Sequence, residues 1–351
     1  MTRGHLVVRA PNWVGDLVMA TPVLEAAVAG ARDMGEPWST VTVLVRGHLA
    51  GVLADGPVEP RTVAVKGSKE EVEAYARLQP DAALLLSNSL GAVWRARRVR
   101  QRMGAALSGR RPLLTHAVVP PSVDGRRLPI PTAHLLRDVA GLAGIHVPSL
   151  HPRLAVREAL VSEERQRGRR LGLEPDEPFV LCCPGAAFGA AKLWPPERFS
   201  AALDGLHERY GWRAVVTGGP GEEPLVEAVV RGTRHESISL AGEPRDLERL
   251  KAWVRASRLV LVGDSGPRWY AAAFDVPCVS VMGPNFPELT ASSLELAEVV
   301  RVEGLECAPC LERHCPLGHH RCMTELPVAD VLAAAERVLA RAAETVAAAV
   351  P

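Results

Sequence analysis

The sequence has no long hydrophobic run and no strong excess of charge of either sign. None of its apolar stretches approaches the roughly 18–20 residues that a membrane-spanning helix requires. The 351 residues carry a formal net charge of +1, which gives no general argument for a nucleic acid as partner. The start of the chain, MTRGHLVVRAPNW, lacks a leader-like apolar segment with a cleavage site, so we expect a cytoplasmic protein.

One common cofactor motif is also absent. No Gly-x-Gly-x-x-Gly follows the first strand predicted in either half, which argues against a dehydrogenase. The chain has seven cysteines, and in a reducing cytosol most of them are expected to be free thiols or metal ligands.

What the sequence does contain is an alternation of short aliphatic runs with longer helical patterns, which is typical of parallel α/β architecture. The strands predicted in the first half are 5–10, 41–45, 61–65, 81–86 and 115–120, with crossover helices at 21–35 and 69–79. The strands predicted in the second half are 179–184, 213–218, 237–242, 258–263 and 277–283.

This repetition predicts two doubly wound, Rossmann-like domains that face a central cleft. We assign 1–160 to an N-terminal domain and 175–326 to a C-terminal domain, since chains of this length usually form more than one core. Between them, 145–178 is proline-marked and then strongly charged, which indicates a linker and a surface helix. Residues 327–351 have apolar residues at helical spacing and are predicted to form a terminal helix that packs back toward the first domain.

Unusual local sequences follow five of the predicted strands. They are PNWVGD, GAAFGAAKLWPPERF, GPGEEP, DSGPRWYAAA and PNFPE. Ligands of open parallel sheets bind beyond the carboxyl ends of the strands, so these turns predict one functional edge in each domain. In the first turn, Asp16 has a structural alternative, since Asp is a common helix N-cap.

The turn after 179–184 has the features of an anion site. Gly185 and Gly189 let backbone N–H groups approach a ligand, and Lys192 adds a positive charge. A helix predicted to start near Pro196 presents its positive end to the same place. A phosphate is the predicted ligand of this turn. The alternative is that Lys192 is an ordinary surface lysine.

Two further turns have similar alternatives. Asp264 and Ser265 are predicted to begin a helix, where the Ser265 hydroxyl and free N–H groups would hold a phosphate or sugar oxygens, with Gly266 allowing close approach. The alternative is an ordinary N-cap. Glu222 or Glu223 is predicted either to accept hydrogen bonds from the two hydroxyls of a ribose or to be a solvent-exposed acid.

A cysteine-rich segment near the end, CAPCLERHCPLGHHRC, contains Cys307, Cys310, Cys315 and Cys322. Four thiolates that begin with Cys-x-x-Cys are able to enclose zinc tetrahedrally. We predict a structural zinc site without a catalytic role, and free buried thiols or disulfides are the alternatives.

The stretch WRARRVRQRMGAALSGRR concentrates arginines over a short span. The structural interpretation of these arginines is a solvent-exposed helix face. The functional alternative is a docking surface for acceptor phosphates or anionic lipid headgroups, and we predict Asn12, Arg95 and Arg98 as acceptor-binding residues. No aromatic platform accompanies the charges, so nucleic acid is not predicted.

Taken in order, RAPNWVGDLVMATPVL, PGAAFGAAKLWPPERF, GDSGPRWYAAAFDVPCVSVMGP and CAPCLERHCPLGHHRCM resemble the heptosyltransferase II branch of the ADP-heptose:lipopolysaccharide heptosyltransferase family. The resemblance spans about residues 5–330. It implies the two-domain GT-B fold and inverting transfer of heptose from ADP-L-glycero-D-manno-heptose to the inner-core heptose of lipopolysaccharide. It also implies reaction at the cytoplasmic face of the inner membrane, with peripheral membrane contact.

The resemblance implies roles for several residues. Asp16 corresponds to the general base, and Lys192 to the diphosphate partner. The donor-binding set implied by the motifs and turns is Gly185, Lys192, Glu222, Asp264, Ser265, Gly266 and Arg268. No Asp-x-Asp occurs in the chain, which agrees with a mechanism that needs no metal or other cofactor.

The chain departs from the family pattern at two places. Trp269 stands where relatives usually carry His, and Ala187 stands where an acidic residue is usual. Trp269 cannot accept a proton, although its N–H donates one hydrogen bond. These departures bear on donor identity, so the alternatives are a transferase of the same fold for another nucleotide sugar and a non-catalytic sugar-nucleotide-binding protein.

Overall fold

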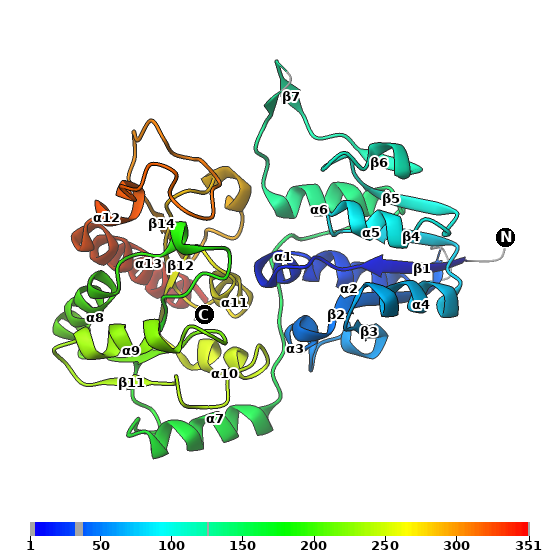
Figure 1. Ribbon diagram of the computed structural model, residues 1–351. Coiled ribbons are helices and arrows are strands. Elements are labelled where there is room, and N and C mark those ends of the chain that lie inside the picture. Colours follow the sequence, from blue (N-terminus) through cyan, green and yellow to red (C-terminus); the bar gives the residue numbers. More distant parts are fainter. Residues whose placement is uncertain (1–3, 32–37, 125, 350–351) are drawn as a thin grey trace. The chain divides into compact units, whose positions relative to one another are not determined.

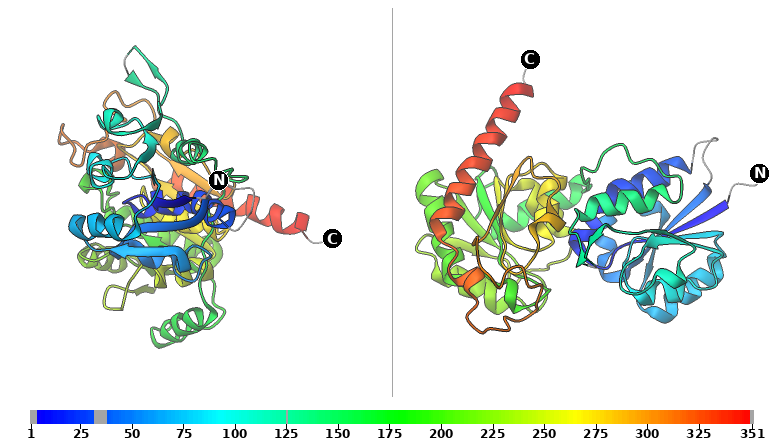
Figure 2. Two further views of the ribbon diagram at one scale, coloured as in Figure 1. Left: turned by 90° about the vertical axis from the view of Figure 1, so that its right-hand side faces the viewer. Right: turned by 90° about the horizontal axis from the view of Figure 1, so that it is seen from above.

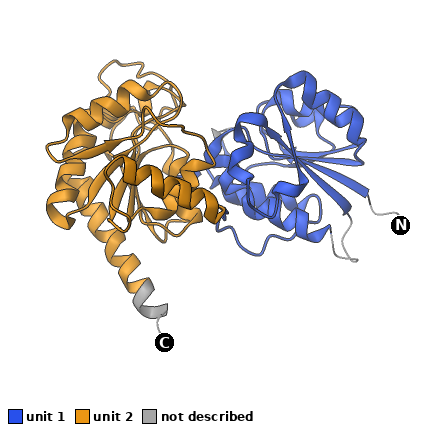
Figure 3. Ribbon diagram, turned by 90° about the horizontal axis from the view of Figure 1, so that it is seen from below, with its two compact units in different colours: residues 1–155, 288–292 blue, residues 156–287, 293–351 orange. Residues whose placement is uncertain are grey.

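The computed structural model describes residues 4–31, 38–124 and 126–349. It consists of two compact units (Figures 1 and 3). Residues 1–155 with 288–292 form unit 1, and residues 156–287 with 293–351 form unit 2. The surface helix predicted within 145–178 is therefore part of unit 2.

Unit 1 contains a six-stranded parallel sheet in the order β3-β2-β1-β4-β5-β6, the doubly wound arrangement. Its strands are β1 (Gly4–Arg9), β2 (Trp38–Arg46), β3 (Thr62–Val65), β4 (Ala82–Leu85), β5 (Gln101–Ala105) and β6 (His116–Val118). A separate hairpin pairs β7 (Ser122–Val123) with β8 (Arg126–Arg127). Val7, Leu44 and Leu85 of the central strands are fully buried, as expected for parallel strands covered on both faces.

The helices of unit 1 lie in the segments that connect its strands and after the sheet. They are α1 (Val14–Met19), α2 (Thr21–Gly30), α3 (Ala50–Leu53), α4 (Ser68–Leu78), α5 (Leu90–Arg95) and α6 (Thr132–Gly141), with short 3₁₀ helices at Gly47–Leu49, Glu59–Arg61 and Arg111–Leu113. The predicted helix 21–35 matches α2 up to Gly30, and its last residues, 32–35, lie outside the described residues.

Unit 2 repeats the topology, with strand order β11-β10-β9-β12-β13-β14. Its strands are β9 (Phe179–Cys183), β10 (Arg213–Val216), β11 (Ser237–Ser239), β12 (Leu259–Gly263), β13 (Cys278–Val281) and β14 (Ala297–Val300). Every residue of β9 and β12 is buried, in agreement with their continuous apolar sequences. The predicted α/β class with two doubly wound domains is confirmed.

The helices of unit 2 are α7 (Glu158–Arg170), α8 (Pro196–Tyr210), α9 (Glu223–Gly232), α10 (Arg249–Ala256), α11 (Pro267–Ala273), α12 (Arg321–Thr324) and α13 (Val328–Ala349), with 3₁₀ helices at Ala190–Lys192 and Pro287–Thr290. α8 begins at Pro196, as predicted, and ends before Gly211, whose left-handed conformation suits a helix C-terminus.

The terminal helix α13 packs on α8, β13 and β14, which all belong to its own unit (Figure 2). Val331, Ala334 and Val338 are buried on the face that it presents to the core. The predicted packing of this helix toward the first domain stays a prediction.

Two strands, β5 and β14, are not marked by an apolar run in the sequence. β5 has the sequence QRMGA, in which only Met103, Gly104 and Ala105 are buried. β14 has the sequence AEVV and is only four residues long. Both strands form because their neighbours in the sheet, β4 and β13, supply backbone partners.

A buried ion network lies at the centre of unit 1. Glu71 on α4 is completely buried, and one of its oxygens is 3.0 Å from Arg9 Nε while the other is 3.0 Å from Arg95 Nε and 3.4 Å from Arg46 Nη2. Arg9 is also completely buried, at the end of β1. The network therefore links α4 and α5 to β1, the strand that precedes the PNWVGD turn.

Removing Glu71 is expected to destabilise the protein strongly. Glu71→Ala leaves the buried Arg9 charge uncompensated, and breaking a buried pair in this way costs about 3–5 kcal/mol. The free energy of unfolding from urea titrations measures the change. The matched control is Glu73→Ala on the same helix, since Glu73 is exposed and 3.9 Å from the exposed Lys69. Equal stability of the two variants contradicts the structural role of Glu71.

Candidate functional site

The predicted donor residues of unit 2 lie around the place where the strand order reverses. β9 and β12 are neighbours in the sheet, and their following loops carry Gly185 and Asp264. In doubly wound sheets this topological switch point is where ligands bind. The backbone of the 184–192 turn packs over Gly263, where an added Cβ would lie 3.6 Å from the Gly185 carbonyl oxygen.

Glu222 lies directly beside Gly185. A Cβ added to Gly185 would lie 2.0 Å from Glu222 Oε2, so a larger residue here would displace the Glu222 carboxylate. The same oxygen accepts the backbone N–H of Gly219 at 2.7 Å, which holds the carboxylate at the end of β10. The two predicted residues are thus brought together, although they are separated by 37 positions in the chain.

Lys192 and Asp264 form an ion pair at this edge. Lys192 Nζ is 2.5 Å from Asp264 Oδ2, and Asn285 Nδ2 donates to the same oxygen at 2.9 Å. Lys192 Nζ also lies 4.7 Å from the centroid of the Phe188 ring, within the range of a cation–π contact. Lys192 and Asp264 are both about nine-tenths buried, so the surface-lysine alternative is wrong.

The DSG turn differs in detail from its prediction. The helix begins at Pro267 with Gly266 as its N-cap residue, so Asp264 and Ser265 precede the helix and neither caps it. Ser265 Oγ is buried and has no hydrogen-bond partner among the described residues. A buried hydroxyl without a partner is costly, and a ligand oxygen would satisfy it.

Arg268 and Trp269 lie beneath this edge. Arg268 is 2% exposed and its guanidinium lies 4.6 Å from the Trp269 ring centroid, while Trp269 is 4% exposed. Burial lowers the pKa of the Arg268 guanidinium, with Cys278 and Asp264 acting in the opposite direction. The predicted contact of Arg268 with a phosphate stays a prediction.

In the turn that follows β1, Asp16 lies inside a helix. α1 begins at Val14, Trp13 is the N-cap residue, and Asp16 is partly buried in the first turn. The N-cap alternative for Asp16 is therefore wrong. An acidic residue in this first turn lies near the positive end of the helix dipole.

Asn12 occupies the switch point of the first sheet. β1 and β4 are neighbours, and Asn12 Nδ2, after β1, donates to Ser87 Oγ, after β4, at 2.9 Å. Arg9 Nη2 donates to Asn12 Oδ1 at 2.7 Å. The buried network of Glu71 thus extends to a predicted acceptor residue, a link that no local sequence signal indicated.

The basic stretch is not one helix face. α5 ends at Arg95, and the stretch then runs through a turn into β5. Arg95 is held by Glu71, and Arg110 is fully buried, where its Nε donates to the Ala105 carbonyl oxygen at 2.8 Å. Burial lowers the pKa of Arg110 to about 10. Arg98 is exposed, and the acceptor-binding roles of Arg95 and Arg98 stay predictions.

The four C-terminal cysteines line one small cavity of about 20 Å³, together with His319, His320 and Ala191. All four are free thiols and partly buried. Hydrogen bonds from backbone N–H groups, that of His320 foremost, lower the pKa of Cys315, and burial raises that of Cys322 to about 11. In the part of the chain that the structure describes, no three His, Cys, Asp or Glu side chains are arranged as a ready metal centre.

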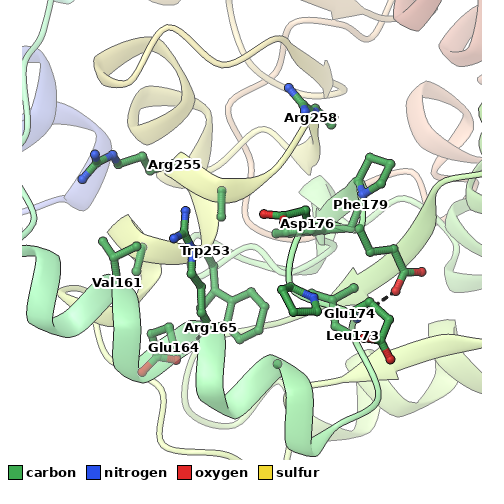
Figure 4. Close-up of a pocket in the computed structure, with 16 residues that line it drawn as sticks. Val161, Glu164, Arg165, Leu173, Glu174, Asp176, Phe179, Trp253, Arg255 and Arg258 are labelled. Carbon is green, nitrogen blue, oxygen red and sulfur yellow. Dashed lines mark hydrogen bonds between the residues drawn. The ribbon is translucent and has the colours of Figure 1, made fainter.

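A larger cavity of about 250 Å³ lies elsewhere in unit 2 (Figure 4). It is lined by α7, α10 and the loop between α7 and β9, with Trp253 Nε1 donating to Glu164 Oε2 at 2.8 Å. Phe179 in its wall is the first residue of β9, so this cavity lies at the amino-terminal edge of the sheet. It is distinct from the edge that carries Lys192.

Comparison with known proteins assigns the family. Residues 79–321 match the model of "Glycosyltransferase family 9 (heptosyltransferase)", which is more than half of the chain. The chain belongs to glycosyltransferase family 9. The predictions of a glycosyltransferase and of a heptosyltransferase relative are confirmed at the level of the family.

Individual relatives of this family 9 member are distant. Lipooligosaccharide heptosyltransferase 2 of Haemophilus influenzae is 23% identical over 321 residues, 86% of this chain and 89% of that protein. Lipopolysaccharide heptosyltransferase 2 of Salmonella typhimurium is 30% identical over 159 residues, 44% of each chain. The match to lipooligosaccharide heptosyltransferase 2 of Campylobacter jejuni spans about half of that protein's length.

Solved structures of the family share the fold. A glycosyl transferase family 9 protein from Veillonella parvula has a TM-score of 0.77 at 21% identity, covering 96% of this chain and 97% of that one. E. coli ADP-heptose heptosyltransferase II has a TM-score of 0.71 at 21% identity, covering 96% and 99%. The predicted GT-B fold is confirmed. In the described residues, no helix has the length and apolar character needed to cross a bilayer.

Proposed function

We propose that this family 9 member transfers heptose, with inversion, from ADP-L-glycero-D-manno-heptose to the inner-core heptose of lipopolysaccharide. The observation that carries the proposal is the convergence of Lys192, Asp264 and Ser265 at the switch point of the second sheet, in a chain of the heptosyltransferase family. The relatives named heptosyltransferase 2 support the choice of donor and acceptor.

In this mechanism Asp16 accepts the proton of the attacking acceptor hydroxyl. The acceptor oxygen forms a bond to C1 of the heptose on the face opposite the diphosphate, and the bond from C1 to the phosphate oxygen breaks with its electron pair. The leaving ADP gains negative charge, which Lys192 and the N–H groups of the 184–192 turn stabilise. Protein charges supply this stabilisation, and the proposal includes no catalytic metal.

The donor residues have defined tasks in the same proposal. Ser265 Oγ supplies a hydrogen bond to a phosphate oxygen, and Glu222 accepts from the ribose hydroxyls. Asp264 and Asn285 hold the Lys192 ammonium in place. Because the acceptor carries a lipid anchor, the proposal includes peripheral contact with the cytoplasmic face of the inner membrane.

The donor is tested by comparing ADP-heptose with ADP-glucose. ADP-heptose is expected to raise the melting temperature and, with a heptose-terminated lipid A acceptor, to yield a heptosylated product detected by mass spectrometry. ADP-glucose is expected to give no product, since a site built around substrate hydroxyls rejects analogues that leave polar groups unpaired.

Two outcomes contradict the proposal. Transfer from ADP-glucose alone assigns the chain to another nucleotide sugar, which is the alternative raised by Trp269 and Ala187. Binding of ADP-heptose without any product, with an acceptor that a known heptosyltransferase II accepts in parallel, indicates a non-catalytic binding protein.

A further inference from the structure

The segment between β14 and α12 is a long loop without regular secondary structure. Residues 301–320 contain no helix or strand, and Leu311 and His320 adopt positive φ angles of 58° and 52°, which are uncommon for residues other than glycine. Loops of this length without secondary structure are uncommon inside compact domains.

The cavity of about 20 Å³ within this segment is lined by all four of its thiols. A volume of this size holds one water-sized sphere, which is enough for a single ion. Cys307, Cys310 and Cys315 come from the loop, and Cys322 comes from α12. The cavity thus gathers ligands from two elements, as a structural staple requires.

Cys315 accepts a hydrogen bond from the backbone of its own segment. Its Sγ accepts the N–H of His320 at 3.4 Å. Outer contacts of this kind orient the ligands of a metal site.

We propose that Cys307, Cys310, Cys315 and Cys322 together bind one divalent metal ion of the kind that prefers four thiolates, Zn²⁺ or Fe²⁺. In the described residues the thiols are not arranged as a ligand set, so the proposal requires the sulfurs to draw together as the metal binds. The protons of the thiols leave as the metal binds.

The position of this cluster gives the metal a role. His320 Nε2 lies 2.8 Å from the Ala191 carbonyl oxygen, and the Ala191 N–H donates to the Arg313 carbonyl oxygen at 3.0 Å. Ala191 precedes Lys192, and a Cβ added to Gly189 would lie 2.5 Å from the Arg313 oxygen. The cysteine segment therefore packs against the turn that carries Lys192.

The same segment also supports the turn of Asn285. The N–H groups of Cys310 and Leu311 donate to the Pro284 carbonyl oxygen at 3.1 and 2.9 Å. A Cβ added to Gly283 would lie 3.0 Å from Cys322 Sγ. The metal would fix both turns that hold the ion pair of Lys192 and Asp264, and this consequence rests on the proposed function.

Metal content is the direct test. The chain is purified without chelators, freed of any histidine tag, and analysed by elemental mass spectrometry, which distinguishes zinc from iron. One metal ion per chain is expected for the wild type, and loss of the metal for Cys310→Ser and Cys322→Ser. The control His314→Ala, in the same segment but outside the cavity wall, is expected to keep the metal.

Thiol chemistry on the unaltered protein keeps the proposal falsifiable if the serine variants fail to fold. With metal bound, the four thiols are expected to resist alkylation until a chelator is added. A metal-free native protein whose four thiols all react at once overturns the proposal. So does a disulfide among them in the peptides of unreduced protein.

A separate measurement of ADP affinity tests whether the metal-bound segment supports the turn that carries Lys192. ADP affinity is expected to fall several-fold in Cys310→Ser and to stay unchanged in His314→Ala. Equal ADP affinity in both variants removes the supporting role. A metal-containing wild type that binds no ADP contradicts the proposed function and leaves the metal site standing.

Discussion

Replacing Asp16 by asparagine is expected to lower the turnover number by about 10²–10⁴ while the affinity for ADP-heptose stays close to that of the wild type. An asparagine amide has nearly the shape of the carboxylate but cannot accept the proton of the acceptor hydroxyl. The range is the usual contribution of a positioned general base. Initial rates with saturating donor and acceptor, together with donor titration by calorimetry, measure the two quantities.

The control for Asp16→Asn is Asp138→Asn. Asp138 is a carboxylate of unit 1 on α6, 3.1 Å from Arg137 and about two-fifths exposed, and its loss is expected to leave turnover unchanged. Unaltered turnover in Asp16→Asn returns Asp16 to a structural role in the first turn of α1. Equal losses of stability in the two variants exclude unfolding as the cause of a difference in rate.

Replacing Lys192 by alanine is expected to lower turnover by about 10²–10³, the usual cost of removing one preorganised group that stabilises developing negative charge. Donor affinity is expected to fall as well, because the ammonium also attracts the diphosphate of the bound donor. The split between kcat and KM separates the two effects. Rates with ADP-heptose at varied concentration provide it.

Lys192→Ala also removes the ammonium that lies 2.5 Å from the Asp264 carboxylate, which keeps its hydrogen bond from Asn285. Loss of a hydrogen-bonded partner of a buried group costs about 1–3 kcal/mol in unfolding free energy. Lys192→Arg preserves the charge and is expected to recover part of the turnover. Lys69→Ala, a fully exposed lysine on α4, is the matched control and is expected to change neither quantity. Normal turnover in Lys192→Ala contradicts the proposed stabilisation of the leaving diphosphate.

The central strands of both sheets were predictable because their chemistry is local. β1, β4, β9 and β12 are continuous aliphatic runs, and burial on both faces requires such sequences. β5 and β14 were missed because their sequences, QRMGA and AEVV, contain polar or charged residues and lack a continuous apolar run. The interpretation of the basic stretch as one helix face was wrong. The burial of Arg110 depends on hydrogen bonds to carbonyl oxygens of β4 and β5, which the local sequence does not show.

The candidate site was predictable as a set of turns but not as a set of contacts. Gly185, Lys192 and Asp264 were each marked by unusual residues after a strand, and the reversal of strand order brings these turns together. The partner roles of Asn285 and Glu71 had no local signal. Asn285 lies in the PNFPE turn, for which no individual residue role was predicted, and Glu71 is one of several acids on a charged helix.

Alternating hydrophobicity and the positions of glycine, proline and short polar turns were enough to specify two doubly wound halves and the edge of each sheet where a ligand is expected. These features depend on interactions between residues close together in the sequence, so the local sequence is enough to predict them. The pairing of Lys192 with Asp264, the space for Glu222 over Gly185 and the burial of Arg9 with Glu71 were decided only by tertiary structure. Each depends on atoms that are dozens of residues apart until the sheets form, and burial then determines which charges must have partners.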